Sequence, residues 1–271
     1  MKPVETASVS ESVELQDDSK DIRNISLVIP MCNEEEVLLP LFKRLLSVTW
    51  RLRRRWAIEL VIVNDGSTDR TGQLLELYFH NFPGVAVKIL HHEMNKGIGA
   101  AMATAFIAAQ GDVVCTMDAD CTYSPEQIES MIDFLESEEA DIVTASPYHP
   151  AAARAKAKAA RLLLSKAASS FYGFLAPKHL YCYTSFFRVY RRSWSKTSLF
   201  ESDGFLAVTE ILLNALSAGA RVREYPIQLS TRVFGESKMH FIKSISNHLR
   251  LMSKMISLRL RPRRGLSGKT A

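Results

Sequence analysis

Two aspartates, Asp118 and Asp120, stand one residue apart directly after an apolar run, Val113 to Met117. A run of this kind is typical of a buried strand in a parallel sheet. Ligands of open α/β sheets bind beyond the carboxyl ends of the strands, so we expect both carboxylates beside a ligand. They are hard oxygen ligands, suited to Mg²⁺ or Mn²⁺ that bridges phosphate oxygens. A solvated turn is the alternative, and the pair alone does not decide between the two.

The elements that must position this pair alternate between strands and helices. Apolar runs bounded by turn residues predict strands over residues 25–30, 58–63, 85–90, 113–117 and 142–144. The segments between these strands have the periodicity or composition of helices. Four strand-then-helix units in succession predict an α/β fold with a doubly wound, mostly parallel central sheet and flanking helices.

The second half of the chain is less regular. Its patterns predict helices over residues 151–174, 203–216 and 241–260, and strands over 184–190 and 221–229. No internal repeat or linker divides the chain. We therefore expect one folded domain over residues 24–240, preceded by a disordered acidic tail at 1–23 and followed by a basic amphipathic helix and tail at 241–271.

The basic end of the chain indicates an anionic partner. The formal net charge is +5, and no acid follows Glu236. Two interpretations of the 241–260 helix remain open. In the first, its apolar stripe packs on the sheet. In the second, its cationic face and the 259–264 tail lie against anionic lipid. We favour peripheral membrane contact, because the helix at 151–170 is also basic. A nucleic-acid-binding module is disfavoured, because no Phe, Tyr or Trp follows Phe241 to provide a stacking platform for bases.

The sequence predicts neither a membrane-spanning helix nor an export signal. No stretch reaches the roughly 18 uninterrupted apolar residues that a spanning helix needs, and no apolar segment follows the basic N-terminus. The four cysteines are Cys32, Cys115, Cys121 and Cys182, and they show no CxxC or Cys/His ligand spacing. We expect reduced thiols in a cytoplasmic protein, with Cys115 in the core.

Two common nucleotide-binding motifs are missing or incomplete. The chain contains no GxxxxGK[ST] segment, which excludes a Walker P-loop. Gly97 and Gly99 supply two glycines of a GxGxxG fingerprint, but Met102 stands at the third position and a polar loop precedes them. A dinucleotide-dependent dehydrogenase is therefore disfavoured.

Carboxylates instead follow three of the predicted strands, as Glu34, Asp65 and the pair of Asp118 and Asp120. Because carboxylates repel phosphate, such a site needs an intervening cation or must read donor groups on a base or ribose. A metal-assisted site for a nucleotide sugar satisfies both conditions.

Four short motifs occur in order along this half of the chain. They are Ile29-Pro30-Met31-Cys32-Asn33-Glu34, Val63-Asn64-Asp65-Gly66-Ser67, Asn95-Lys96-Gly97 and Asp118-Ala119-Asp120. This ordered set resembles the family 2 glycosyltransferases, which have the GT-A fold. The later segments 183–192, 204–210 and 232–238 resemble the polyprenyl-phosphate branch of that family, above all the dolichyl-phosphate mannosyltransferases.

The resemblance implies a role for each matching residue. The nucleoside would be held by Pro30, Cys32, Glu34, Val63 and Asp65. Lys96 would be either a donor contact or a solvated loop charge. A divalent cation on the diphosphate would be held by Asp118, Asp120 and the backbone of Ala119. Phosphate oxygens would accept hydrogen bonds from Arg232 and Lys238.

The resemblance also implies inverting glycosyl transfer, in which a cation neutralises the departing nucleoside diphosphate. A lipid-phosphate acceptor is already ionised and requires no strong general base. A hydroxyl acceptor requires one, for which Asp203 and Glu210 are the candidates. On the acceptor side we expect Arg188.

Three positions depart from the pattern of the mannosyltransferases. Cys32 stands where they usually have tyrosine, and Thr122 stands where glutamine, serine or histidine is often found beside the metal. The arginine expected near Pro147 is missing, and Arg154 or Arg161 would take over its task. These departures concern the identity of the sugar and the base more than the class of reaction.

The sequence therefore predicts a transferase that moves a sugar from a nucleoside-diphosphate sugar, first GDP-mannose and second UDP-glucose, to polyprenyl phosphate. The alternative is transfer from UDP-glucose or another donor to a hydroxyl of a cell-envelope glycan. A non-catalytic nucleotide- or nucleic-acid-binding protein is the remote alternative, against which the intact aspartate pair argues. We expect the protein at the cytoplasmic face of a membrane.

Overall fold

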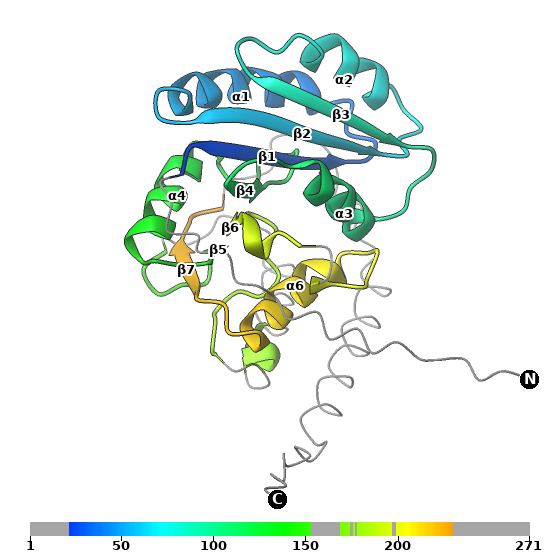
Figure 1. Cartoon of the computed structure of the whole chain (residues 1–271). Coiled ribbons are helices and arrows are strands. Elements are labelled where there is room, and N and C mark those ends of the chain that lie inside the picture. Colours follow the sequence, from blue (N-terminus) through cyan, green and yellow to red (C-terminus); the bar gives the residue numbers. More distant parts are fainter. Residues whose placement is uncertain (1–21, 153–168, 174–175, 177, 197–198, 230–271) are drawn as a thin grey trace, which may run out of the picture.

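A computed structural model of the chain describes residues 22–152, 169–173, 176, 178–196 and 199–229 (Figure 1). The predictions for residues 1–21, for most of the basic helix at 151–174 and for everything from residue 230 onward lie outside these ranges. Arg154, Arg161, Arg232 and Lys238 belong to that group. Within the described ranges, no helix is both long enough and apolar enough to cross a bilayer.

The core of the fold is a seven-stranded sheet in the order β3-β2-β1-β4-β6-β5-β7. The strands are β1 (Asn24–Met31), β2 (Ala57–Asp65), β3 (Ala86–His92), β4 (Val113–Thr116), β5 (Ile142–Ser146), β6 (Arg188–Arg191) and β7 (Val222–Pro226). β1 pairs in parallel with β2 and β4, β2 pairs in parallel with β3, and β5 pairs in parallel with β7. Only β6 runs antiparallel to its neighbours, β4 and β5, among the described strands. The predicted mostly parallel sheet is confirmed.

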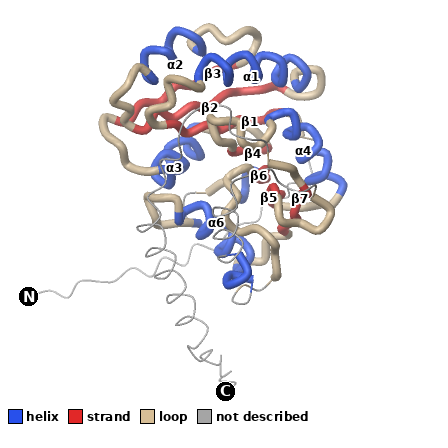
Figure 2. Tube along the Cα trace, turned by 180° about the vertical axis from the view of Figure 1, so that it is seen from behind, coloured by secondary structure: helices blue, strands red, loops and turns tan. Residues whose placement is uncertain are grey.

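Helices cover both faces of this sheet (Figures 1 and 2). They are α1 (Leu38–Leu52), α2 (Thr71–Phe79), α3 (Ile98–Ala108), α4 (Ile128–Ser137, after a 3-10 turn at Pro125–Gln127) and α6 (Leu206–Ser217). Buried residues of α1, α2 and α4 form one hydrophobic cluster with the sheet, and those of α3 and α6 form the other. The result is a three-layer α/β/α arrangement.

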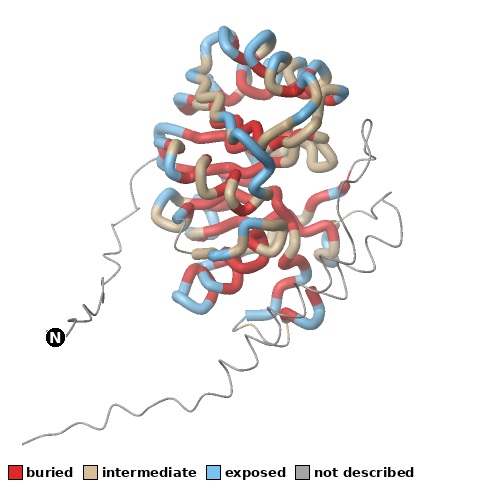
Figure 3. Tube along the Cα trace, turned by 90° about the vertical axis from the view of Figure 1, so that its right-hand side faces the viewer, coloured by how far each residue is buried: buried red, intermediate tan, exposed pale blue. Residues whose placement is uncertain are grey.

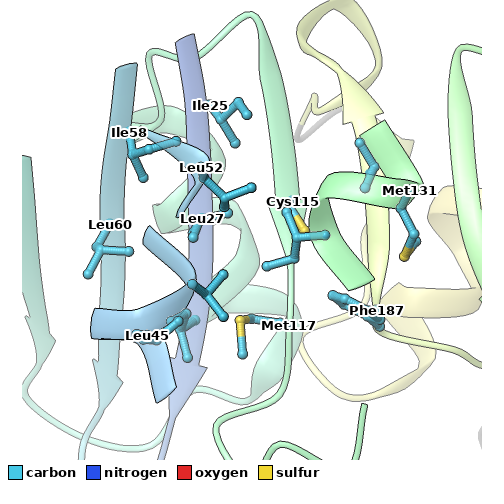
Figure 4. Close-up of a cluster of buried hydrophobic side chains, with 14 of the residues drawn as sticks. Ile25, Leu27, Leu45, Leu52, Ile58, Leu60, Cys115, Met117, Met131 and Phe187 are labelled. Atoms are coloured by element: carbon cyan, nitrogen blue, oxygen red, sulfur yellow. The ribbon is translucent and has the colours of Figure 1, made fainter. Parts of the chain in front are cut away.

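Alternation along the strands explains the two clusters. Ile25 and Leu27 of β1 face the α1 side together with Leu60 of β2, while Val28 and Val61 face the α3 side. Figure 4 shows side chains of β1, β2, α1 and α4 converging in the first cluster, with Cys115 and Phe187 among them. The predicted burial of Cys115 is confirmed. In Figure 3, buried residues follow the strands and exposed ones lie on the outer surfaces of helices and loops.

Arg188 corrects one prediction. It was expected to act on the acceptor side, but it is completely buried at the start of β6. Its guanidinium donates hydrogen bonds to Thr144 Oγ1 at 3.2 Å, to the Tyr183 carbonyl at 2.7 Å and to the Val208 carbonyl. A buried cation is tolerated only when its donors are satisfied in this way. Arg188 therefore ties β5, α6 and the segment before β6 together.

We predict that Arg188→Met lowers the free energy of unfolding by about 3 kcal/mol, because each hydrogen bond from a charged donor contributes about 1.5–3 kcal/mol and the acceptors stay buried. Urea unfolding followed by circular dichroism measures the change. Arg192→Met, at an exposed position four residues along the chain, should change it by less than about 0.5 kcal/mol. A stable Arg188→Met protein that has lost only activity would restore the acceptor role.

Candidate active site

Acidic residues gather at the carboxyl edge of the parallel strands. β1 ends at Met31, β2 ends at Asp65 itself, and β4 ends at Thr116. Because these strands are parallel, the loops that carry Glu34, Asp65 and the pair of Asp118 and Asp120 leave the sheet at one edge. The sequence-based prediction that these carboxylates share an edge is confirmed by this topology.

The loop after β1 is fastened to the loop after β2. Asn33, in the left-handed region at φ 53°, accepts a hydrogen bond at Oδ1 from the Thr68 amide at 2.7 Å. The Asn33 amide donates to Ser67 Oγ at 2.9 Å, and the Glu34 amide donates to Thr71 Oγ1 at 2.7 Å. These bonds delay the start of α1 until Leu38 and fix the backbone on which Cys32 and Glu34 are carried.

Asp65 connects the loop after β2 to the loop after β3. Its side chain is only 5% exposed, and the His92 side chain beside it is 8% exposed. Oδ1 accepts hydrogen bonds from His92 Nδ1 at 2.7 Å and from the Lys96 amide at 2.9 Å. Oδ2 accepts one from the Gly97 amide at 2.8 Å. Asp65 therefore has the turn-forming role, while its role as a nucleoside ligand stays a prediction. Lys96 is held by its amide, and its side chain is exposed.

The N-terminus of α3 is covered by the backbone of Asp203. The Asp203 carbonyl accepts hydrogen bonds from the Gly99 amide at 2.6 Å and the Ala100 amide at 3.3 Å. A Cβ atom on Gly97 would lie 2.4 Å from the Asp203 oxygen, and one on Gly99 would lie 2.1 Å from the Ser202 oxygen. The two glycines therefore permit this close approach. They do not form a pyrophosphate cradle, in agreement with the disfavoured dinucleotide fingerprint.

Glu210 holds the same segment from the other side. It is buried in α6, and its Oε2 accepts hydrogen bonds from the amides of Glu201 at 3.2 Å and Ser202 at 3.0 Å. A carboxylate engaged by two backbone amides favours a positioning role over that of a general base. Of the two predicted base candidates, Asp203 is the exposed one.

We predict that Gly99→Ala disturbs this contact. Alanine is the better helix former by up to about 1 kcal/mol, but its Cβ would collide with the Ser202 carbonyl, so we expect a net loss of about 1–3 kcal/mol in unfolding free energy together with reduced activity. Gly204→Ala is the matched control, since no atom lies within 4 Å of a Cβ there. Equal stability of the two variants in urea unfolding would contradict the proposed clash.

Asp118 and Asp120 lie in the turn after β4, and both are partly buried. Asp120 Oδ1 accepts a hydrogen bond from the Thr122 amide at 2.9 Å. Cys121, between Asp120 and Thr122, adopts a left-handed φ of 52°. Thr122 Oγ1 is buried without a hydrogen-bond partner in the described structure. This oxygen, two residues after Asp120, is of the hard type that suits Mg²⁺ or Mn²⁺.

The electrostatics of this turn are negative. Burial raises the pKa of the Tyr123 phenol well above its usual value, and the charge of Asp118 adds to the effect. The pKa of the Cys121 thiol is likewise raised to about 11, chiefly by burial, with Arg44 opposing the shift and the charge of Asp120 adding to it. Both side chains therefore stay protonated and neutral, so the negative charge of this turn comes from the carboxylates of Asp118 and Asp120.

The donor set fits a divalent cation that shares its ligands with a substrate. No group of three or more His, Cys, Asp or Glu residues suited to a metal occurs within the described ranges. Mg²⁺ is commonly held by one or two carboxylates together with substrate phosphates and water, which is what Asp118 and Asp120 can provide. The Ala119 side chain is buried beneath the turn.

The remaining predicted nucleoside contacts differ in how deeply they are buried. Pro30 and Cys32 lie at the end of β1, and Cys32 Sγ accepts a hydrogen bond from Asn95 Nδ2 at 3.0 Å. The Val63 side chain is completely buried in the cluster with α3, so it supports the site from beneath. Glu34 is partly buried.

His92 is the residue that sequence reasoning missed. In the sequence, His91, His92 and His149 show no metal-ligand spacing, so spacing alone does not single out His92. The signal that would have found His92 is the register of two predicted parallel strands, since Asp65 of β2 pairs with His92 of β3.

Residues 26–199 match the family model of glycosyl transferase family 2. The chain belongs to this family. It is 30% identical over 243 residues to undecaprenyl-phosphate 4-deoxy-4-formamido-L-arabinose transferase of Pectobacterium atrosepticum, covering 89% of this chain and 70% of that protein. It is 29% identical to polyprenol monophosphomannose synthase of Mycolicibacterium smegmatis, covering 79% of this chain and 80% of that protein.

The fold is that of GT-A glycosyltransferases. Glucosyl-3-phosphoglycerate synthase of Mycobacterium tuberculosis, in complex with Mn²⁺, UDP and glucosyl-3-phosphoglycerate, superposes with a TM-score of 0.59 at 21% identity, covering 90% of this chain and 82% of that one. As a member of family 2, the protein is a glycosyltransferase. The GT-A fold that the sequence predicted is confirmed.

Proposed function

We propose that this glycosyltransferase moves a sugar from a nucleoside-diphosphate sugar to polyprenyl phosphate with inversion at the anomeric carbon, and that GDP-mannose is its donor. The observation that carries the proposal is the gathering of Glu34, Asp65, Asp118 and Asp120 at one edge of the parallel sheet. The names of the similar transferases from Pectobacterium and Mycolicibacterium support a polyprenyl-phosphate acceptor. UDP-glucose is the second donor to test.

Each group of residues has a task in this reaction. Pro30, Cys32, Glu34 and Asp65 hold the nucleoside. Asp118 and Asp120 would hold Mg²⁺ or Mn²⁺, which would supply positive charge to the diphosphate. Arg232 and Lys238 donate hydrogen bonds to phosphate oxygens.

A polyprenyl-phosphate acceptor requires no strong general base. An oxygen of the ionised lipid phosphate forms a bond to the anomeric carbon while the bond to the nucleoside diphosphate breaks, so no proton has to be removed. Glu210, whose carboxylate is engaged by the amides of Glu201 and Ser202, is then free to remain a positioning residue. A hydroxyl acceptor would require a base, for which the exposed Asp203 is the better placed.

A lipid acceptor also calls for contact with a membrane. We propose that the basic segments at 151–170 and 241–264 attach the protein to an anionic surface. Flotation with liposomes tests this, since binding should rise with the fraction of anionic lipid. Equal recovery with neutral and anionic liposomes would contradict it.

The reaction itself is tested by incubating the protein with radiolabelled GDP-mannose or UDP-glucose, a short polyprenyl phosphate and Mg²⁺ or Mn²⁺. We expect label in the organic phase with GDP-mannose, and only when a divalent cation is present. Label that enters a water-soluble glycan instead would favour the hydroxyl acceptor.

We predict that Asp118→Asn lowers turnover by roughly a hundredfold to a thousandfold, the usual effect of removing one electrostatic stabiliser of a departing charge. Asp133→Asn on α4 is the matched control, because Asp133 forms only an exposed ion pair with Arg55 among the contacts described. Unfolding curves should coincide within about 0.5 kcal/mol for both variants. Full activity of Asp118→Asn would refute the assigned role.

A further inference from the structure

A chain of three side chains connects the ends of β2 and β3 to α3. His92 Nδ1 lies 2.7 Å from Asp65 Oδ1, and His92 Nε2 lies 2.8 Å from Thr104 Oγ1. Both members of the His92–Asp65 pair are at most 8% exposed. The pair follows from strand register, since these two residues are partners in the parallel ladder.

The chemistry of the partners fixes the imidazole. An ionised carboxylate is an acceptor only, so Nδ1 carries the proton that is donated to Asp65. The hydrogen bond between Nε2 and the Thr104 hydroxyl then fixes the orientation of the ring from its other side. Histidine ligands of metals are oriented through their second nitrogen in the same manner.

The bonds at Asp65 leave capacity for a ligand. A carboxylate has about four acceptor positions, two on each oxygen. His92 and the Lys96 amide use those of Oδ1, while only the Gly97 amide uses Oδ2 among the bonds described. Without His92, Oδ1 loses its side-chain donor, and only the amides of Lys96 and Gly97 hold the carboxylate against rotation about its terminal torsion, which is broad by nature.

We propose that His92 is a positioning residue of the donor site, which locks the Asp65 carboxylate so that Oδ2 faces an N–H donor of the nucleobase. This inference rests on the proposed role of Asp65 in holding the nucleoside. His92 itself does not touch the donor. Its effect is on nucleotide affinity rather than on the rate of sugar transfer.

The test replaces one imidazole nitrogen at a time. The amide of asparagine reproduces the Nδ1 donor, and the longer glutamine reproduces Nε2. Affinity for GDP and UDP in the presence of Mn²⁺ is measured by isothermal titration calorimetry for the wild type, His92→Asn, His92→Gln and His92→Phe. His80→Phe is the control, because the His80 side chain is 69% exposed on the outer end of α2.

We expect His92→Phe to weaken binding of the preferred nucleotide by about tenfold, because the Asp65 carboxylate loses the charge-assisted hydrogen bond from His92 that orients it. His92→Asn should recover to within about threefold of the wild type, and His92→Gln should not. In transfer assays the donor KM should rise in parallel while kcat changes less than threefold.

Four results would overturn the inference. Equal affinity of His92→Asn and His92→Gln would remove the special role of Nδ1, and this comparison does not depend on whether His92→Phe folds. Loss of kcat at unchanged KM would place the effect in the chemical step. A wild type that binds neither nucleotide would remove the proposed function as well, whereas normal wild-type binding with unaffected variants would remove this inference alone.

Discussion

Parallel pairing of β1, β2, β3 and β4 is the constraint on which the rest of the structure depends. Parallel strands require crossover helices, and every loop that enters such a helix leaves the sheet at the same edge. The acids of three loops are thereby brought together although they lie far apart in the sequence. The loops are then fastened to one another, by Asn33 between the first two and by Asp65 between the second and third.

The negative charge of the carboxylates decides what this edge of the sheet can bind. Carboxylates repel a diphosphate, and the usual alternative for an anion, the N-terminus of a helix, is closed at α3 because the Asp203 carbonyl and the Asp65 carboxylate already accept its amides. In the proposed reaction, a diphosphate at this edge therefore requires a cation, which Asp118 and Asp120 would hold. Glu210 contributes indirectly, since it holds the segment that closes α3.

Much of this could be predicted from the sequence, because strand periodicity and strand-end acids are local signals. The order of the units, the buried Cys115 and the shared edge of Asp65 and Asp118 all follow from them. Long-range placement could not be predicted. Arg188 was assigned to the acceptor side, but its strand lies antiparallel between β4 and β5, and its acceptors come from Tyr183, Thr144 and α6. The contact between His92 and Asp65 likewise depends on the register between two strands.

The most direct test of the central claim is the binding of Mn²⁺ followed by its electron paramagnetic resonance signal, with and without GDP or UDP. If the strand-end acids bind a diphosphate through a cation, the free Mn²⁺ signal should fall strongly only when protein and nucleotide are both present, and the double variant Asp118→Asn and Asp120→Asn should abolish the fall. Tight nucleotide binding in EDTA, or unchanged Mn²⁺ uptake by the double variant, would contradict the account.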